Sequence, residues 1–128
     1  MKKTNPNSNL KGSNFDREQY LYLTTRGRKS GLPREIEIWF TQRDGRFYVI
    51  AEYSTSHWLQ NLRANPLASV RIVGEKFRVH AGLINRENEP ELHQTIADLS
   101  AKKYGWGDGT IVELRPVTDE DAADLRPP

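Results

Sequence analysis

Residues Tyr20–Arg34 read Y-L-Y-L-T-T-R-G-R-K-S-G-L-P-R, and the rest of the chain is arranged around this stretch. Its apolar start, Tyr20–Leu23, predicts a buried strand, which leads through two threonines into a loop that ends near Pro33. Gly27 and Gly31 allow tight turns of the backbone and a close approach to a ligand. Because hydroxyls, cationic side chains and backbone N–H groups lie between these glycines, the loop is suited to hold a phosphate or carboxylate.

Taken alone, this loop has a second interpretation as a solvent-exposed basic connection between two strands. It departs from the P-loop pattern, because Lys29–Ser30 lacks a glycine directly before the lysine. It also departs from the dinucleotide-binding fingerprint, because no helix is predicted after it. The motif therefore predicts an anion site without naming its ligand.

The length of 128 residues suits one domain with a single hydrophobic core. We expect residues 1–14 to form a flexible polar lead-in, residues 15–115 the folded domain, and residues 116–128 an acidic, proline-containing tail. No apolar run reaches the length of a membrane span and no signal peptide is recognisable, so we expect a cytoplasmic protein without integral membrane association. The absence of cysteine excludes disulfides and thiolate catalysis.

Charge is distributed unevenly along the chain. Residues 1–63 carry 11 Lys/Arg against 6 Asp/Glu, whereas residues 64–128 carry 8 against 11. The basic half contains the loop, which suits a small anionic ligand rather than DNA, because DNA binding needs a basic face with several phosphate contacts. No nucleic-acid partner is predicted. His80 and His93 lack partners at metal-ligand spacing, so no metal site is predicted either.

Alternation of apolar and polar residues predicts a hairpin after the loop. The first strand covers residues 35–41, the Asp44–Gly45 pair marks the turn, and the return strand covers residues 46–52. The return strand has apolar residues on both faces, including Tyr48 and Ile50 on the second one. A helix, a ligand or another subunit is expected to cover that second face, which leaves room for a homodimer.

Two helices and three more strands are predicted downstream. A helix begins near His57, with hydroxyl residues as N-caps, and stops at Asn65 before a proline. Asn88 and Glu91 resemble a capping box at the start of a second helix, which ends at Gly105. The strands cover residues 68–73, 76–84 and 110–114. Together, six strands in hairpin order with two or three peripheral helices predict a mainly β (α+β) antiparallel barrel.

Two motifs in this sequence resemble the deazaflavin-dependent nitroreductase family. They are L-T-T-x-G-R-K-S-G-x-P-R at Leu23–Arg34, followed by a W-F strand and a D-G hairpin, and W-x-x-N-L-R-A-N-P at Trp58–Pro66. The segment K-Y-G-W-G at Lys103–Gly107 extends the resemblance, which covers roughly residues 15–115. It implies a split β-barrel related to flavin-binding pyridoxamine-phosphate-oxidase-like proteins. It also implies binding of coenzyme F420, an 8-hydroxy-5-deazaflavin with a phosphate and an oligoglutamate tail.

The resemblance also assigns residues to the cofactor site. Arg28, Lys29, Ser30 and Gly31 would hold the phosphate, with Thr25 nearby. The other assigned contacts lie at the start of the next strand, at the end of the return strand and on the helix that follows: Pro33, Ala51, Glu52, Tyr53, Trp58, Asn61 and Asn65.

The implied activity is hydride transfer from reduced F420 to a small electron-poor substrate such as a quinone, nitro compound or enone. The cofactor supplies this chemistry, so the protein needs no nucleophile, but a proton donor would assist, for which Tyr53, His57 and Tyr104 are candidates. Residues 52–57 are shorter than the glycine-rich segment typical of the family, which keeps FMN as an alternative cofactor on the same barrel. A non-catalytic module that binds a cofactor, haem or lipid is the alternative from another class.

Overall fold

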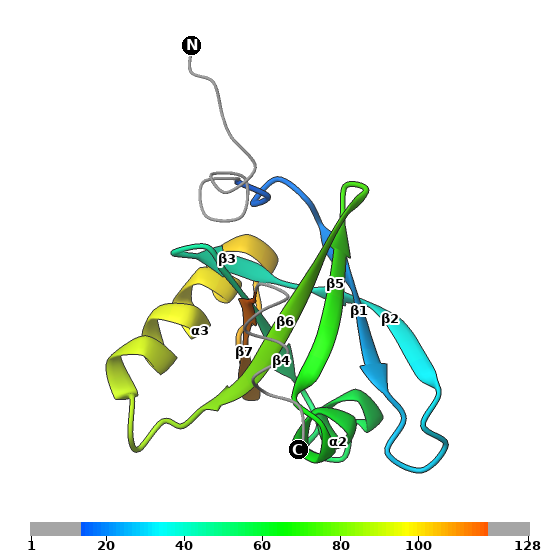
Figure 1. Cartoon of the computed structure of the whole chain (residues 1–128). Helices are drawn as coiled ribbons and strands as arrows, with labels where there is room; N and C mark the ends of the chain where they lie inside the picture. The colour runs from blue at the N-terminus through cyan, green and yellow to red at the C-terminus, as the bar shows by residue number, and fades with distance from the viewer. Residues whose placement is uncertain (1–13, 118–128) are drawn as a thin grey trace.

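The computed structural model describes residues 14–117, and shows one antiparallel sheet with two helices packed against it (Figure 1). Residues 1–13 of the predicted lead-in and residues 118–128 of the predicted tail lie outside this range. The helices are α2 (His57–Ala64) and α3 (Pro90–Tyr104). The strands are β1 (Tyr20–Arg26), β2 (Pro33–Trp39), β3 (Thr41–Arg43), β4 (Arg46–Ala51), β5 (Leu67–Ile72), β6 (Glu75–Ile84) and β7 (Thr110–Pro116).

The two edge strands of the sheet are neighbours in the sequence. The strand order is β2-β1-β5-β6-β7-β4-β3, and only Phe40 separates β2 from β3. The sheet must therefore curl round until its two edges come together, which makes a barrel rather than a flat layer. Figure 1 shows β3 and β2 following one another along a continuous, bent path across the other strands. The mainly β architecture with peripheral helices is thus confirmed.

The strand predicted over residues 35–41 is wrong in detail, because the chain forms two strands here and the sheet has seven strands instead of six. The break falls at Phe40, whose backbone groups bond to the end of α3. Its N–H donates to Tyr104 Oη (3.0 Å), and its carbonyl accepts from Tyr104 Oη (2.8 Å) and Lys103 Nζ (3.1 Å). These side chains satisfy polar groups that a neighbouring strand would otherwise have to satisfy.

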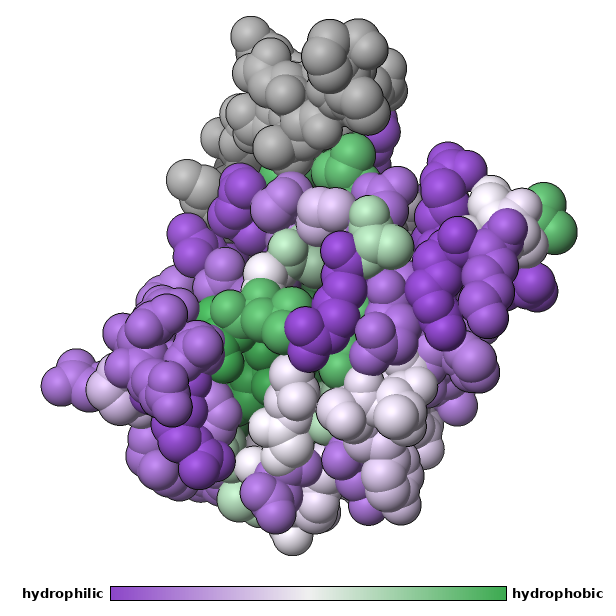
Figure 2. All heavy atoms as spheres, turned by 90° about the horizontal axis from the view of Figure 1, so that it is seen from below, coloured by the Kyte–Doolittle hydropathy of each residue, from purple (hydrophilic) through white to green (hydrophobic). Residues whose placement is uncertain are grey.

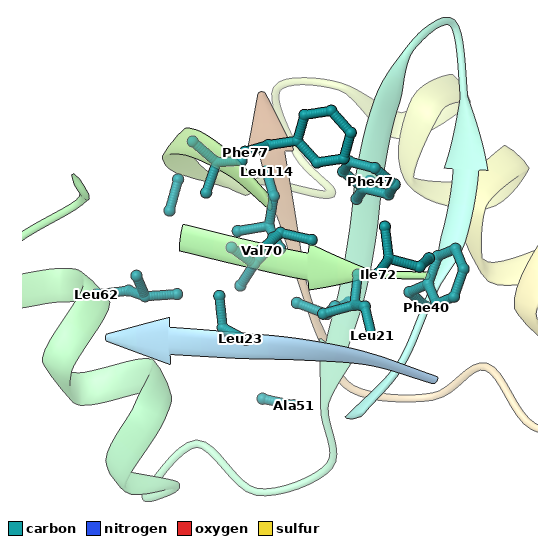
Figure 3. Close-up of a cluster of buried hydrophobic side chains, with 14 of the residues drawn as sticks. Leu21, Leu23, Phe40, Phe47, Ala51, Leu62, Val70, Ile72, Phe77 and Leu114 are labelled. Carbon is teal, nitrogen blue, oxygen red and sulfur yellow. The ribbon is translucent and has the colours of Figure 1, made fainter. Parts of the chain in front are cut away.

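The main core fills the inside of the barrel. The predicted strand at Tyr20–Leu23 is present, with Leu21 and Leu23 buried and the two tyrosines more exposed. Leu62 reaches the core from α2 (Figure 3). One phenylalanine ring on β4 contacts two others, one between β2 and β3 and one on β6, with centroids about 6 Å apart, which suits edge-on and tilted aromatic contacts. These rings belong to Phe40, Phe47 and Phe77.

A second apolar cluster lies between the outer face of the sheet and α3. Tyr48 and Ile111 from the sheet pack there with Ile96 from the helix, and Ile50 is partly buried beside them. Of the three coverings expected for the second face of the return strand, a helix, a ligand or another subunit, the structure shows the helix. Tyr48 is satisfied in this setting because its hydroxyl donates to Glu113 Oε2 (2.9 Å), and burial raises the pKa of the tyrosine well above its ordinary value.

Both predicted helix caps are wrong in detail. Ser56 does occupy the N-cap position of α2, but its hydroxyl donates to the carbonyl of Tyr53 (2.8 Å) instead of capping the helix. The N-cap of α3 is Glu89, one residue later than predicted, and no side chain caps it. Asn85 instead accepts the N–H groups of residues 87 and 88, which stabilises the preceding turn. The predicted end of α3 is confirmed, with Gly105 at a positive φ of 76°.

Viewed from below, apolar surface gathers near the middle of the molecule, with strongly hydrophilic surface on both sides of it (Figure 2). Among residues 14–117, neither helix has the length and apolar character required to span a membrane.

The strand predicted over residues 110–114 extends to Pro116 in the structure, and the N–H of Val117 donates to the carbonyl of Arg78 (2.8 Å).

The contacts of Tyr104 make a prediction for stability. Tyr104→Phe keeps the ring stacked on Trp39 but removes the hydroxyl that bonds to Phe40 and to the carbonyl of Gln19. We expect the free energy of unfolding to fall by about 1–3 kcal/mol, because the backbone N–H of Phe40 loses its acceptor in a partly buried place. Urea denaturation followed by circular dichroism measures this. Tyr53→Phe is the control, since Tyr53 is 65% exposed, and equal stability of the two variants would contradict the assignment.

Candidate functional site

The loop between β1 and β2 is a compact turn held by its own backbone. The N–H of Gly27 donates to the carbonyl of Leu32 (2.8 Å), and the N–H of Gly31 donates to the carbonyl of Gly27 (2.8 Å). Gly31 has a φ of 74°, a conformation that favours glycine. A Cβ atom on Gly27 would lie 2.6 Å from Ser30 Oγ, so a side chain at this position would displace the Ser30 hydroxyl from its place over the turn.

Helix α2 is fastened to this loop through one buried amide. Asn61 Oδ1 accepts two hydrogen bonds from Arg28, one from its backbone N–H (3.1 Å) and one from its guanidinium (2.8 Å). Asn61 Nδ2 donates to Thr25 Oγ1 (3.1 Å), and both residues are buried. The guanidinium of Arg28 also lies 3.4 Å from His57 Nδ1. A single side chain thus connects the end of β1, the loop and the helix.

A pocket of about 370 Å³ lies between the loop and α2, and we call it the loop pocket. It is bordered by three cationic side chains, Arg28, Lys29 and Arg34, and by no carboxylate. None of the ion pairs found within residues 14–117 includes these three residues. The remaining lining residues are Thr25, Gly27, Ser30, Ile36, His57, Trp58 and Asn61. The loop pocket therefore has an excess of positive charge that suits an anion.

A second hollow of about 570 Å³ lies farther along β2, and we call it the aromatic recess. Trp39 lines it and stacks on Tyr104 with ring centroids 4.4 Å apart and an angle of 5°. The edge of Trp106 meets Trp39 at 6.5 Å. Ile36 in the loop pocket and Ile38 in the recess are two residues apart, so they lie on the same face of β2 and make the two hollows neighbours. The other lining residues are Tyr20, Glu37, Ile50 and Glu52.

The structure brings most of the predicted cofactor residues together. The loop pocket is lined by Thr25, Arg28, Lys29, Ser30, His57, Trp58 and Asn61, and Gly31 lies in the same loop.

Other predicted site residues lie elsewhere. Glu52 lines the aromatic recess, while Pro33 and Asn65 line a third, larger hollow of about 840 Å³, which residues of β1, β5 and β6 also line. Ala51 is buried at the end of β4 and pairs with Thr110. Tyr53 is exposed beyond that strand.

Tyr104 is placed differently from the other two candidate proton donors. Its hydroxyl is engaged with the backbone of Phe40 and Gln19, and burial raises its pKa above the ordinary value, which keeps the hydroxyl protonated. His57 lies in the loop pocket beside Arg28. No single hollow contains all three candidates.

Arg34 and Ile36 line the loop pocket but were absent from the predicted site. Arg34 pairs with Thr25 in the hairpin register, and its guanidinium lies 3.5 Å from Ser30 Oγ. A register counted back from the two ends of the loop would have placed Arg34 beside Thr25. The alternation along β2 would then have turned Ile36 to the same side as Ile38.

Comparison with known proteins identifies the family. Residues 2–118 match the model of the F420H(2)-dependent quinone reductase family. Among solved structures, an F420-H2 dependent reductase (FDR-A) is 19% identical with a TM-score of 0.65, over 77% of this chain and 95% of that chain. The heme storage protein HutZ from Vibrio cholerae is 21% identical with a TM-score of 0.64, over 81% and 86%. A domain-swapped dimer is 21% identical with a TM-score of 0.55, over 77% and 81%.

These structural neighbours confirm the split-barrel fold, and the family match confirms the resemblance carried by the two sequence motifs. Because this match covers most of the chain, it also supports coenzyme F420 over FMN. The chain belongs to the F420H2-dependent quinone reductase family and is an oxidoreductase that uses coenzyme F420.

Proposed function

We propose that this protein reduces a small, electron-poor substrate of the quinone type, with the phosphate of F420 in the loop pocket and the substrate in the aromatic recess. The observation that carries the proposal is the loop pocket itself, in which three cationic side chains face a space bordered by no carboxylate. The family of the chain supplies the reaction class.

The residues of the loop pocket fit a phosphate group. Lys29 and Arg34 have no ion-pair partner within residues 14–117, and the hydroxyl of Ser30 lies between the loop and Arg34. Charge-assisted hydrogen bonds from such groups hold phosphate oxygens strongly. Arg28 has a different role in the proposal, because its guanidinium is already bonded to Asn61 and holds the loop in shape.

The neighbouring surface fits a flat ring system. Ile36 and Ile38 are partly buried against the core and contribute apolar surface to the loop pocket and to the recess, respectively, and Trp39 and Trp106 add aromatic rings to the recess. Reduced F420 supplies a hydride when it is bound. The protein orients the reactants and excludes water, and the ring of Tyr104 holds Trp39 in place. Tyr53 or His57 is the proposed proton donor.

A homodimer is also part of the proposal. The domain-swapped dimer among the structural neighbours shows that a similar fold forms an assembly of that kind. In this chain α3 covers the outer face of β4, so the apolar residues there are already buried within one molecule. Sedimentation equilibrium of the purified protein measures the state directly, and a molecular mass of 14.7 kDa at all concentrations would exclude the dimer.

The activity is tested by adding menadione to the protein with reduced F420. We expect the absorbance of oxidised F420 to appear only when protein, cofactor and quinone are all present. A parallel fluorescence titration with F420 and FMN should show tighter binding of F420. Tight binding of F420 without turnover of any quinone would support a cofactor-binding module instead of an enzyme.

Removing the two unpaired cations of the loop pocket should weaken cofactor binding. For Lys29→Ala combined with Arg34→Ala we expect the Kd for F420 to rise by about thirtyfold or more, which corresponds to roughly 1 kcal/mol for each lost contact. Arg43→Ala is the control, because Arg43 pairs with Asp44 in a distant turn. Fluorescence titration measures all three proteins, and an unchanged Kd in the double variant would remove the phosphate assignment.

Replacing the buried amide of Asn61 by a carboxylate should also weaken cofactor binding. Asn61→Asp keeps an acceptor for Arg28 but introduces a negative charge at the loop pocket, so we expect about tenfold weaker binding of F420. Asn65→Asp is the matched control, since Asn65 lies outside that pocket and its side chain accepts the N–H of Leu67 (3.1 Å). Equal losses in both variants would mean that the position of the charge does not matter.

A further inference from the structure

We propose that the aromatic recess selects substrates by charge, accepting flat aromatic molecules that are neutral or cationic and rejecting those that carry an anionic group. Glu37 and Glu52 are the residues that make this selection. The inference rests on the proposed function, because it takes the recess as the place where the substrate binds.

The aromatic walls of the recess define the shape of its ligand. Trp39 and Tyr20 are 39% and 43% exposed, so a substantial part of each ring is open to a bound molecule. Trp39 is fixed in orientation, because its ring stacks on the parallel ring of Tyr104. A rigid indole with Trp106 at its edge favours a flat, apolar guest, which would stack on it. The face of an indole also attracts a cation.

Two carboxylates supply the charge of the recess, and they come from different strands. Glu37 lies on β2, and Glu52 directly follows β4. The residues that line the recess include these two acids and no basic side chain. Neither acid belongs to an ion pair found within residues 14–117. The recess is therefore negative, whereas the neighbouring loop pocket is positive.

The carboxylate of Glu37 is fixed in direction. It accepts a hydrogen bond from the hydroxyl of Tyr22 (2.8 Å). Arg71, the nearest cation along this face, lies over the Tyr22 ring at 4.3 Å, but its guanidinium pairs with Glu35 (3.2 Å). Glu35 is thus paired with Arg71, whereas Glu37 lines the recess and belongs to no ion pair found within residues 14–117.

Repulsion between like charges can reject a ligand, and an anionic group in the recess would meet two carboxylates that have no ion-pair partner within residues 14–117. At a separation near 6 Å and with the screening typical of a protein surface, two such repulsions weaken binding by at least about tenfold. The two hollows along β2 therefore have opposite charge preferences, since the loop pocket binds anionic groups and the recess excludes them. The expected substrate class is an uncharged quinone, with a sulfonated or carboxylated quinone as the excluded class.

The test measures binding without cofactor, through quenching of tryptophan fluorescence by three quinones of matched ring size. These are menadione, its sulfonate and a trimethylammonium derivative. Trp58→Phe removes the one tryptophan outside the recess, so that the signal comes from Trp39 and Trp106. At low salt we expect the sulfonate to bind at least about tenfold more weakly than menadione and the cation at least as tightly. The difference in affinity between menadione and its sulfonate should shrink in 0.5 M salt, because the Debye length is then only about 4 Å.

Variants in the same background assign the effect to residues. Glu37→Gln combined with Glu52→Gln should bring the sulfonate to within about threefold of menadione, since glutamine keeps the size of the side chain and can still accept from Tyr22. Glu35→Gln is the matched control on the same strand, and should keep the full difference because Glu35 is paired and lies outside the recess.

Two results would overturn the inference: equal affinity for menadione and its sulfonate in the parent protein, or an unchanged difference in the double glutamine variant. A separate turnover assay with reduced F420 keeps this outcome apart from the proposed function. If menadione and its sulfonate are both reduced with equal kcat/KM, the charge selection is disproved and the proposed function stands. If no quinone is reduced while the charge difference in binding remains, the function fails and the recess keeps its selectivity.

Discussion

The backbone of Phe40 is the point on which the rest of this structure depends. Here the chain leaves one edge of the sheet and enters the other, and the side chains of Tyr104 and Lys103 bond to the polar groups that are freed by the break. These bonds couple the end of α3 to the closure of the barrel. They also set the position of Trp39, the residue directly before the break, against the ring of Tyr104. The contacts of Tyr104 therefore support both the closure of the barrel and the Trp39 wall of the aromatic recess.

The loop pocket depends on a second connection of the same kind. Asn61 has one buried amide with a donor side and an acceptor side, and it uses both to join Thr25 to Arg28. The loop itself contains few apolar residues, so packing alone would leave it free to move. Fixing the loop backbone from α2 places Lys29 in a defined position without using the Lys29 side chain for structure, while the Ser30 hydroxyl accepts the N–H of Leu32 within the turn. This separation of tasks explains why two of the three cations stay available for a ligand.

Much of the fold could be predicted from the sequence, because its signals are local. The apolar start of β1, the alternation along β2, the apolar residues on both faces of β4 and the glycine at the end of α3 are visible in short windows. The break at Phe40 could not be predicted, since it is caused by residues more than sixty positions away. The helix caps were misplaced because Ser56 and Asn85 bond within their own turns, an alternative that the sequence pattern does not distinguish from capping. The loop motif led to most of the loop pocket, while Arg34 required the strand register.

The position of β2 at the edge of the sheet has a consequence for how copies of this chain meet. Among the described residues, β2 forms a strand ladder with β1 only, so its other side is an edge of the split barrel. Such an edge invites a strand from a second molecule and, with it, aggregation. The exposed charges of Arg34, Glu35 and Glu37 oppose that pairing. The carboxylate of Glu37 therefore has a second consequence, because a negative charge on this edge opposes edge-to-edge pairing as well as lining the recess.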